Sequence, residues 1–516
     1  MASPSLAARL CAGLIALSAV PAAADPVHVD PQSLPFVRRV DERFQSYNVE
    51  MAELIGGSFW KPYSQLGDAS AEAARGDSGG AVALNANLFS QRAPVDLSNR
   101  RLRVLAAALG PAYVRVSGSW ANTMYFQDSD APPPASPPEG YRGVLTREQW
   151  RGVVDFARAV DAKLVISYAV NPAVRDSDGV WTPVQARAFM DFNRSIGGEI
   201  YAAELFNEPN LSQHAGGPAN YNGAAFARDI AAFRAFTAQA APNMLILGPG
   251  DSPGLSAPEE YLSSAPQPRF DVFDYHFYPA VSQRCAPPDS PLMGVTPARA
   301  MTENYLQLTD RAFAAHKPLR DRYAPNAPIW ITETAGAACG GAPWSATFLD
   351  TFRYLDQAGR LAKQGVDVIF HNTLAAGEYA LIDEFTHEPR PNYWAALLWR
   401  RLMDETVLDA GANTTDLHLY AHCMRDQPGG ITLLAINIGD ERAEVSTSTR
   451  SQVYALTASE LQSDDVRLNG RTLTMRSNDR LPDLRPRRTR AGTIGIAAHS
   501  IAFIAIPDAN NSSCQL

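Results

Sequence analysis

The segment Ile200-Tyr-Ala-Ala-Glu-Leu-Phe206, which runs on into Asn207-Glu208-Pro209-Asn210, gives the first indication of the fold. Its apolar part is typical of a buried β-strand, and Pro209 cannot donate to a strand ladder, so the chain must turn there. In barrels of parallel strands, catalytic groups gather where the strands end. The segment therefore predicts that Glu208 stands at the rim of a cleft.

Similar apolar runs recur on both sides of this segment, and amphipathic, helix-like stretches separate them. The runs cover residues 112–116, 163–168, 244–247, 272–276, 329–332 and 366–370. Such alternation is typical of an α/β fold with a parallel sheet, and at this length it predicts a (β/α)8 TIM barrel over residues 96–398. A doubly wound sheet stays open as an alternative, although no Gly-rich phosphate loop follows the first strand.

The two ends of the chain have a different character. Residues 399–516 consist of short runs rich in β-formers separated by turns, which predicts an accessory β-sandwich. Residues 25–95 are partly strand-like, and we expect them to contribute to the same sandwich and to lead into the barrel. Residues 1–24 combine one early Arg, an apolar run and a small-residue cleavage site, which is the pattern of a signal peptide. The protein is therefore expected to be secreted or periplasmic.

Charge and cysteine usage narrow the possible partners. A net charge of -9 argues against nucleic acid or an anionic membrane as the main partner. Cys285, Cys339, Cys423 and Cys514 remain after the signal peptide, and in an exported protein they indicate two disulfides, for which three pairings are possible. Because there is no CxxC motif or Cys/His cluster, we predict no metal site. We expect a monomer.

A second glutamate repeats the arrangement around Glu208. Ile329-Trp-Ile-Thr-Glu-Thr334 is an apolar strand that ends in Glu333 and is followed by a turn-rich segment. Two carboxyl groups on the rims of different strands are what a double-displacement glycosidase requires, and in a retaining enzyme they lie about 5 to 5.5 Å apart. This chemistry needs only the carboxyl groups and water, so we predict no cofactor.

Asp274-Tyr-His-Phe-Tyr-Pro279 ends another predicted strand. His276 and Tyr278 are two residues apart, so on a strand they point to the same face and both can reach the cleft. The tyrosine hydroxyl could orient the nucleophile, and the imidazole could bind a sugar hydroxyl or the nucleophile itself. The alternative for His276 is a packed histidine without a role in binding.

The sequence resembles glycoside hydrolase family 79, the heparanase and β-glucuronidase family. The stretch from Trp330 through Gly340-Gly-Ala-Pro343 carries the resemblance most strongly, and Ala376-Gly-Glu-Tyr-Ala-Leu-Ile-Asp383 supports it. The Asn-Glu-Pro triplet at 207–209 is shared with many clan A glycosidases. The resemblance implies a clan A barrel with a β-sandwich built from both chain ends. It implies that Glu208 is the acid/base and Glu333 the nucleophile.

The resemblance also implies roles for residues around the two glutamates. Asn207 would bind the sugar 2-hydroxyl, Tyr278 would hold Glu333, and Glu50 would lie near the non-reducing hydroxyls. Backbone N–H groups of a Gly-rich turn can bind an anion closely. In the family pattern such groups receive the uronic carboxylate, and here they are those of Gly340 and Gly341, assisted by Tyr379.

The resemblance extends to the disulfides. The pair Cys423–Cys514 would close the C-terminal sandwich, as in the family. The pair Cys285–Cys339 is expected from its position in loops after neighbouring strands.

One departure bears on the substrate. Ser117-Gly-Ser-Trp-Ala-Asn122 lacks the basic residue with which animal heparanases grip sulfate. The leading hypothesis is therefore a retaining β-glucuronidase that acts on glucuronic-acid-containing oligo- or polysaccharides. The alternatives are an endo-acting heparanase-like hydrolase of glycosaminoglycans, a clan A enzyme for neutral sugars, and a non-catalytic carbohydrate-binding protein.

Overall fold

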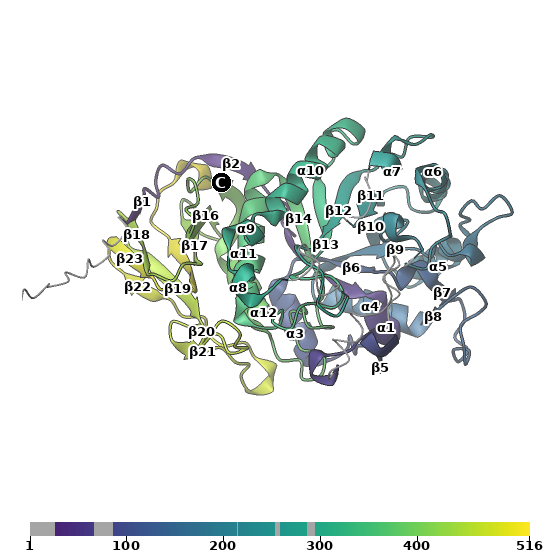
Figure 1. The fold of residues 1–516 in the computed structure, drawn as a ribbon, viewed down its shortest axis with the longest axis horizontal. Helices are drawn as coiled ribbons and strands as arrows, with labels where there is room; N and C mark the ends of the chain where they lie inside the picture. Colours follow the sequence, from purple (N-terminus) through teal and green to yellow (C-terminus); the bar gives the residue numbers. More distant parts are fainter. Residues whose placement is uncertain (1–25, 67–85, 214, 253–258, 286–294, 516) are drawn as a thin grey trace, which may run out of the picture.

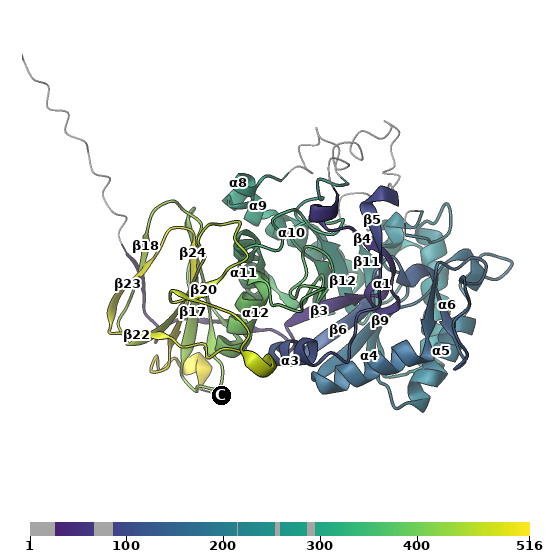
Figure 2. The ribbon, with the colours of Figure 1, turned by 90° about the horizontal axis from the view of Figure 1, so that it is seen from below.

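The computed structural model describes residues 26–66, 86–213, 215–252, 259–285 and 295–515, so the predicted signal peptide at 1–24 lies outside the described residues. It has two parts that lie side by side, a barrel surrounded by helices and a smaller all-β part (Figure 1). In the view from below, the yellow-green C-terminal segment forms most of the all-β part (Figure 2). Among the described helices, none combines the length and the apolar character needed to cross a membrane.

Eight parallel strands close into a barrel, which confirms the predicted TIM-barrel class. The strand order around the barrel follows the chain, as repeated strand–helix units require. In that order the strands are β3 (Gln45–Glu50), β6 (Ala112–Ser117), β9 (Ala162–Ser167), β10 (Ile200–Glu204), β11 (Leu245–Asp251), β12 (Val272–Phe277), β13 (Ile329–Thr334) and β14 (Val366–His371).

Helices and two short sheets complete the barrel part. The helices are α1 (Met51–Ile55), α3 (Arg100–Leu109), α4 (Arg147–Ala159), α5 (Val184–Ser195), α6 (Gly223–Ala240), α7 (Glu259–Ser263), α8 (Pro297–Ala300), α9 (Glu303–Leu306), α10 (Leu308–Tyr323), α11 (Phe348–Gln364) and α12 (Pro391–Leu402). The short sheets pair β4 (Gly57–Trp60) with β5 (Phe89–Arg92), and β7 (Met124–Gln127) with β8 (Gly143–Thr146).

The barrel interior changes from apolar to polar along the strands. Side chains from seven strands form an apolar layer: Tyr113, Val165, Ala202, Leu247, Val272, Trp330, Val368 and Phe370. Because strand side chains alternate, the residues two positions further on also point inward, and these include Arg115, Glu204 and Asp274. The apolar layer closes the barrel from below, and the polar layer forms the floor of the site.

The all-β part contains a nine-stranded and a three-stranded sheet. The larger sheet contains β2 (Phe36–Arg39), β15 (Met403–Leu408), β16 (Leu417–Met424), β17 (Ile431–Asn437), β19 (Ser451–Thr457), β20 (Arg467–Leu468), β21 (Arg471–Thr472), β22 (Arg487–Thr489) and β24 (Ser500–Ile506). The smaller contains β1 (Val27–Val29), β18 (Ala443–Thr447) and β23 (Gly492–Ile496). An apolar cluster joins the two sheets, and the other face of the larger sheet packs on the barrel helices.

The barrel starts earlier than the sequence suggested. Its first strand, β3, lies at 45–50, inside the segment 25–95 that was expected only to join the sandwich and lead into the barrel. The strand carries the polar residues Ser46, Asn48 and Glu50 at alternate positions, so it lacks the apolar run by which the other strands were recognised. Strands β1 and β2 from the same segment do pair with β18 and β15 of the all-β part.

Candidate active site

Glu208 sits on a turn directly after β10. The residue adopts a left-handed conformation with φ 55°, and its N–H donates to the carbonyl of Gly250 at 3.1 Å. The preceding residue, Asn207, is fixed through its backbone, because the Asn122 side chain donates to its carbonyl at 3.0 Å and accepts from its N–H at 3.2 Å. A positive φ strains any residue other than glycine, and such strained residues cluster at functional sites. The strand end therefore presents Glu208 from a rigidly held turn.

A bulge in β13 turns Glu333 toward the same site. Along the pairing of β12 with β13, Tyr275 faces Ile331 but His276 already faces Glu333, so β13 carries one extra residue. Such bulges re-aim a side chain next to active sites. The carboxylate of Glu333 accepts from the Tyr278 hydroxyl at 2.6 Å and from Arg115 Nη1 at 3.2 Å.

The two glutamates meet across His276. Oxygens of Glu208 and Glu333 and a ring nitrogen of His276 all lie within 4.8 Å of one another. The Nδ1 atom of His276 is 3.1 Å from Glu208 Oε1 and 3.6 Å from Glu333 Oε2. Burial alone would lower the pKa of His276, but the carboxylates of Glu333 and Glu208 raise it to about 9. The imidazole therefore supplies a donor between two acids at neutral pH.

Arg115 forms the cationic floor of the site. Its Nη2 donates to Glu204 at 2.6 Å and to the Asn207 side-chain oxygen at 2.7 Å, and Nη1 donates to Glu333. Glu204 and Glu333 raise the pKa of Arg115, although burial opposes them. Glu204 and Glu333 belong to groups of acids with the spacing of metal ligands. Both already form an ion pair with Arg115.

Asp274 lies beside Glu204 in this polar floor. It accepts from the Thr332 hydroxyl at 2.7 Å. Burial and the charge of Glu204 raise the pKa of Asp274 to about 7. The sequence analysis assigned no role to Glu204 or Asp274. Each lies two positions after an apolar residue of its strand, β10 or β12, that points into the barrel. This spacing was the signal in the sequence that both acids point inward.

Asn372, which directly follows β14, organises the opposite wall. Its amide nitrogen donates to Glu50 at 3.1 Å, to the Tyr278 hydroxyl at 2.9 Å and to the Tyr379 hydroxyl at 3.3 Å. Burial and the nearby Glu333 carboxylate raise the pKa of Glu50 well above its usual range. Asn372, for which the sequence gives no signal, therefore brings together Glu50, Tyr278 and Tyr379, three residues to which the family resemblance assigns roles in the site.

Glu53 supports Glu50 from the first turn of α1 and gives a testable pH dependence. Its carboxylate accepts from the Glu50 N–H at 2.9 Å, and burial raises the pKa of Glu53 to about 8. Between about pH 4.5 and 8 the folded state keeps a proton that the unfolded state has released. The free energy of unfolding should therefore fall as pH rises through this window, by at most about 1.4 kcal/mol per pH unit.

The variant Glu53→Gln mimics the protonated acid and should remove this contribution. We expect it to gain stability relative to the wild type as pH rises from 5 to 8. Urea unfolding of both proteins at pH 5, 6.5 and 8 measures the difference in their free energies of unfolding. The contributions of other titrating groups, such as His371 and His422, are the same in both proteins and cancel. A difference that stays constant with pH would contradict the assignment.

The Gly340–Gly341 turn adjoins Tyr379. Cys339, Gly340 and Gly341 have φ of 62°, 79° and 90°, a run of positive values that favours glycine. The Glu378 N–H donates to the Gly340 carbonyl at 3.2 Å. Within the described part of the chain, the N–H groups of Gly340 and Gly341 donate to no protein acceptor. Backbone N–H groups in such a turn can bind an anion.

The two disulfides have the expected pairings. Cys423 and Cys514 link β16 to the C-terminal end of the all-β part, and Cys285 and Cys339 link the loops that follow β12 and β13. The second disulfide immediately precedes Gly340, so it ties the Gly-rich turn to the neighbouring loop.

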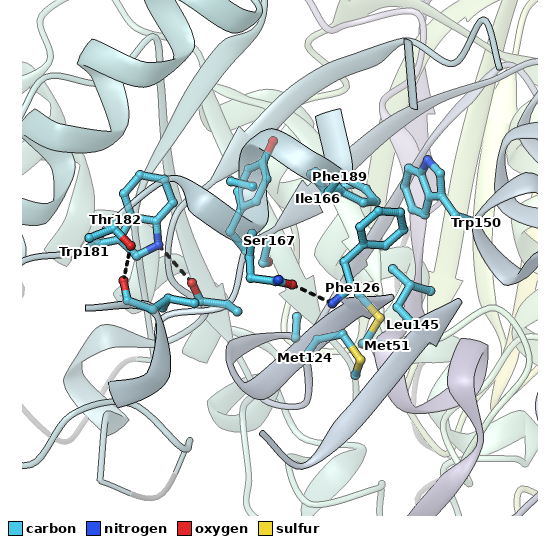
Figure 3. A pocket seen from close by; sticks show the side chains of 16 residues that line it. Met51, Met124, Phe126, Leu145, Trp150, Ile166, Ser167, Trp181, Thr182 and Phe189 are labelled. Atoms are coloured by element: carbon cyan, nitrogen blue, oxygen red, sulfur yellow. Dashed lines mark hydrogen bonds between the residues drawn. The ribbon is translucent and has the colours of Figure 1, made fainter. Parts of the chain in front are cut away.

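An apolar cavity lies outside the barrel wall, behind β9 (Figure 3). Figure 3 shows Trp150, Phe189 and Met124 among the side chains that line it. Its volume of about 40 Å³ is far below the 300 Å³ or more of typical ligand pockets. This cavity is therefore too small to hold a sugar.

Comparison with known proteins identifies the family. Residues 89–359, more than half of the chain, match the model of the glycosyl hydrolase family 79 N-terminal domain. The chain belongs to glycosyl hydrolase family 79. Bovine (Bos taurus) heparanase is 27% identical over 81% of this chain and 86% of its own length. Baicalin-beta-D-glucuronidase of Scutellaria baicalensis is 29% identical over 51% of this chain and 50% of its own length.

A solved structure shares the fold of this family 79 chain. The 4-O-alpha-L-rhamnosyl-beta-D-glucuronidase of Fusarium oxysporum superposes with a TM-score of 0.64 at 13% identity, over 92% of this chain and 99% of its own. Together with the family match, this likeness supports a glycoside hydrolase with a TIM barrel and an accessory β-domain.

Proposed function

We propose that this protein is a retaining β-glucuronidase that hydrolyses β-linked glucuronic acid from glycans. The observation that carries the substrate class is the Gly340–Gly341 turn, whose free N–H groups lie next to Tyr379. Tyr379 in turn reaches Glu50 and Glu333 through Asn372 and Tyr278. A uronic carboxylate at the turn would therefore sit on the same wall as the proposed nucleophile. The relatives named heparanase and baicalin glucuronidase support this class.

The proposed chemistry takes two steps. Glu333 attacks the anomeric carbon and forms an ester, while Glu208 protonates the departing glycosidic oxygen. Glu208 then takes a proton from water, whose oxygen attacks the anomeric carbon and releases Glu333. The carboxylate oxygens of Glu208 and Glu333 lie within 4.8 Å of each other, which suits direct attack and is shorter than the separation of about 6.5–9.5 Å at which inverting enzymes place a water.

The residues around the pair have matching proposed roles. Tyr278 and Arg115 would hold Glu333 in place for attack through their hydrogen bonds to its carboxylate. Asn207, fixed by Asn122, would bind the 2-hydroxyl of the sugar. Glu50, on the wall of the site that Asn372 organises, would bind sugar hydroxyls at the non-reducing side. His276 would donate to whichever of the two glutamates carries charge.

Hydrolysis of nitrophenyl β-glucuronide beside the β-glucoside and the β-xyloside tests the proposal. A clear preference for the glucuronide supports it. A preference for a neutral sugar would contradict the glucuronidase assignment and leave the two-glutamate mechanism standing.

An endo-acting, heparanase-like activity is the second candidate, because several relatives carry that name. It would be favoured by cleavage of heparan oligosaccharides without hydrolysis of any nitrophenyl sugar. We expect desulfated chains to be cleaved better than sulfated ones, because Asn122 is fully buried against the Asn207 backbone and cannot bind a sulfate.

The turn itself can be tested with Gly340→Ala. A Cβ at this position would lie 2.6 Å from Trp60 Cγ, and φ is 79°. The substitution should displace the N–H donors and lower kcat/KM on the glucuronide by about 10- to 100-fold, the range expected for a hydrogen bond to a charged group. Steady-state kinetics on glucuronide and glucoside measure the effect.

The matched control for this test is Gly411→Ala. It has comparable backbone strain at φ 95°, but the added Cβ meets nothing within 4 Å. We expect this control to keep the wild-type preference for the glucuronide. An equal loss of activity on both substrates in Gly340→Ala would show that the turn has only a structural role.

We further propose that the protein is exported and monomeric. The two disulfides are those of an oxidising compartment. Loss of activity after reduction, and a monomer mass by light scattering, are the expected results.

A further inference from the structure

Arg284 is a buried arginine that forms no ion pair among the described residues. Its side chain is about 1% exposed, and Nη1 donates to the Lys61 carbonyl at 2.7 Å. Its Nε and Nη2 atoms have no hydrogen-bond partner. Within the described ranges, no carboxylate lies at ion-pair distance from it.

Other buried arginines of the protein are paired. Arg115 pairs with Glu204, Arg353 with Asp350 and Arg360 with Asp356. Taking a charge out of water is costly unless an opposite charge compensates it. Among the described residues, Arg284 is therefore a buried cation at which a bound anion would be stabilised.

Two contacts place Arg284 behind the Gly-rich turn. Its guanidinium stacks on the Tyr63 ring at 4.0 Å from the centroid, and the Tyr63 hydroxyl donates to the Gly341 carbonyl at 3.0 Å. The same loop is tied to the turn by the Cys285–Cys339 disulfide and by the Ser282 N–H, which donates to the Ala338 carbonyl at 3.0 Å. Only one aromatic side chain thus separates the cation from the backbone that would receive an anion.

We propose that Arg284 is a specificity-determining residue that stabilises the carboxylate of a glucuronosyl unit bound at the Gly340–Gly341 turn, without touching it. The inference rests on the proposed function and deepens it. The turn supplies short-range donors, and Arg284 supplies the positive charge that favours an anionic over a neutral sugar. A field acting across one layer of protein weakens with distance but is not screened as it is in water.

In this role Arg284 would affect substrate binding and not the rate of the chemical step. The sugar carboxylate carries the same charge before and during the reaction, so the field of Arg284 stabilises the bound substrate and the transition state equally. Loss of the charge should therefore raise KM and leave kcat nearly unchanged.

The test is Arg284→Gln, assayed on nitrophenyl β-glucuronide and β-glucoside. We expect the KM for the glucuronide to rise about tenfold, kcat to change less than about threefold, and the preference for the glucuronide to fall about tenfold. The matched control is Arg92→Gln, which removes the same charge from the same wall, where Glu384 already balances it. The control should keep the preference within about threefold.

Arg284→Lys keeps the charge but cannot stack as a flat group on Tyr63. It should retain the preference within about threefold, and it keeps the test decisive if the Gln variant does not fold. An unchanged preference in folded Arg284→Gln, or a lost preference in folded Arg284→Lys, would overturn the proposal. A wild-type enzyme that prefers the glucoside would instead overturn the proposed function itself.

Discussion

Glu333→Gln should lower kcat on nitrophenyl β-glucuronide by at least about 10,000-fold, the scale on which a nucleophile contributes. The amide keeps the size of the side chain and its contact with the Tyr278 hydroxyl, so the fold should be unchanged. Stopped assays over hours, together with thermal unfolding of the variant, measure both expectations.

Glu208→Ala is the informative companion to this variant. Nitrophenolate departs without help from an acid, so the first step should survive while the second, which needs a base, becomes slow. Added azide should then restore turnover by attacking the glycosyl-enzyme, and the product should be a glycosyl azide of retained configuration. Azide should not rescue Glu333→Gln in the same way. Identical behaviour of the two variants would contradict the division of roles.

Arg115→Met should lower the free energy of unfolding by about 3–5 kcal/mol, the cost of breaking a buried ion pair from one side. The guanidinium is fully buried and donates to both Glu204 and Glu333, so its removal leaves two carboxylates without a cation. Urea unfolding at pH 7.5 measures the loss. The loss should shrink at pH 5, because the stranded acids can then take up protons.

Arg194→Met provides the control for the stability measurement. It removes a surface pair with Asp191 in which both side chains are about 60% exposed, and such pairs contribute at most about 1 kcal/mol. Equal destabilisation by the two substitutions, or a loss in Arg115→Met that grows at low pH, would contradict the role of Arg115 as the cationic floor.

The sequence predicted the barrel because seven of its strands are apolar runs between helix-like stretches. The eighth, β3, was missed, because the barrel at that point faces a polar layer and Ser46, Asn48 and Glu50 fill the inward positions. Glu208 and Glu333 were found because each ends an apolar run. The bulge that turns Glu333 inward depends on how β12 and β13 pair, and local sequence does not encode that register.

The supporting residues were harder to predict for a related reason. Glu204 lies inside a strand, where a single charged residue gives no pattern, and only the closed barrel brings it to Arg115. Asn372 contacts three predicted residues from different parts of the chain, so its role arises from tertiary structure alone. The free N–H groups at Gly340 and Gly341 follow from backbone angles that the glycines permit but do not by themselves require.

Trapping of the covalent intermediate tests the assignment of Glu333 as the nucleophile of a glucuronidase. A 2-deoxy-2-fluoro-β-glucuronyl fluoride should form the ester quickly and release it slowly, and intact-mass and peptide mass spectrometry would locate the label. We predict one label per chain, on the peptide that contains Glu333, and no label with the corresponding glucosyl reagent under the same conditions. A label on another residue, or labelling only by the glucosyl reagent, would contradict it.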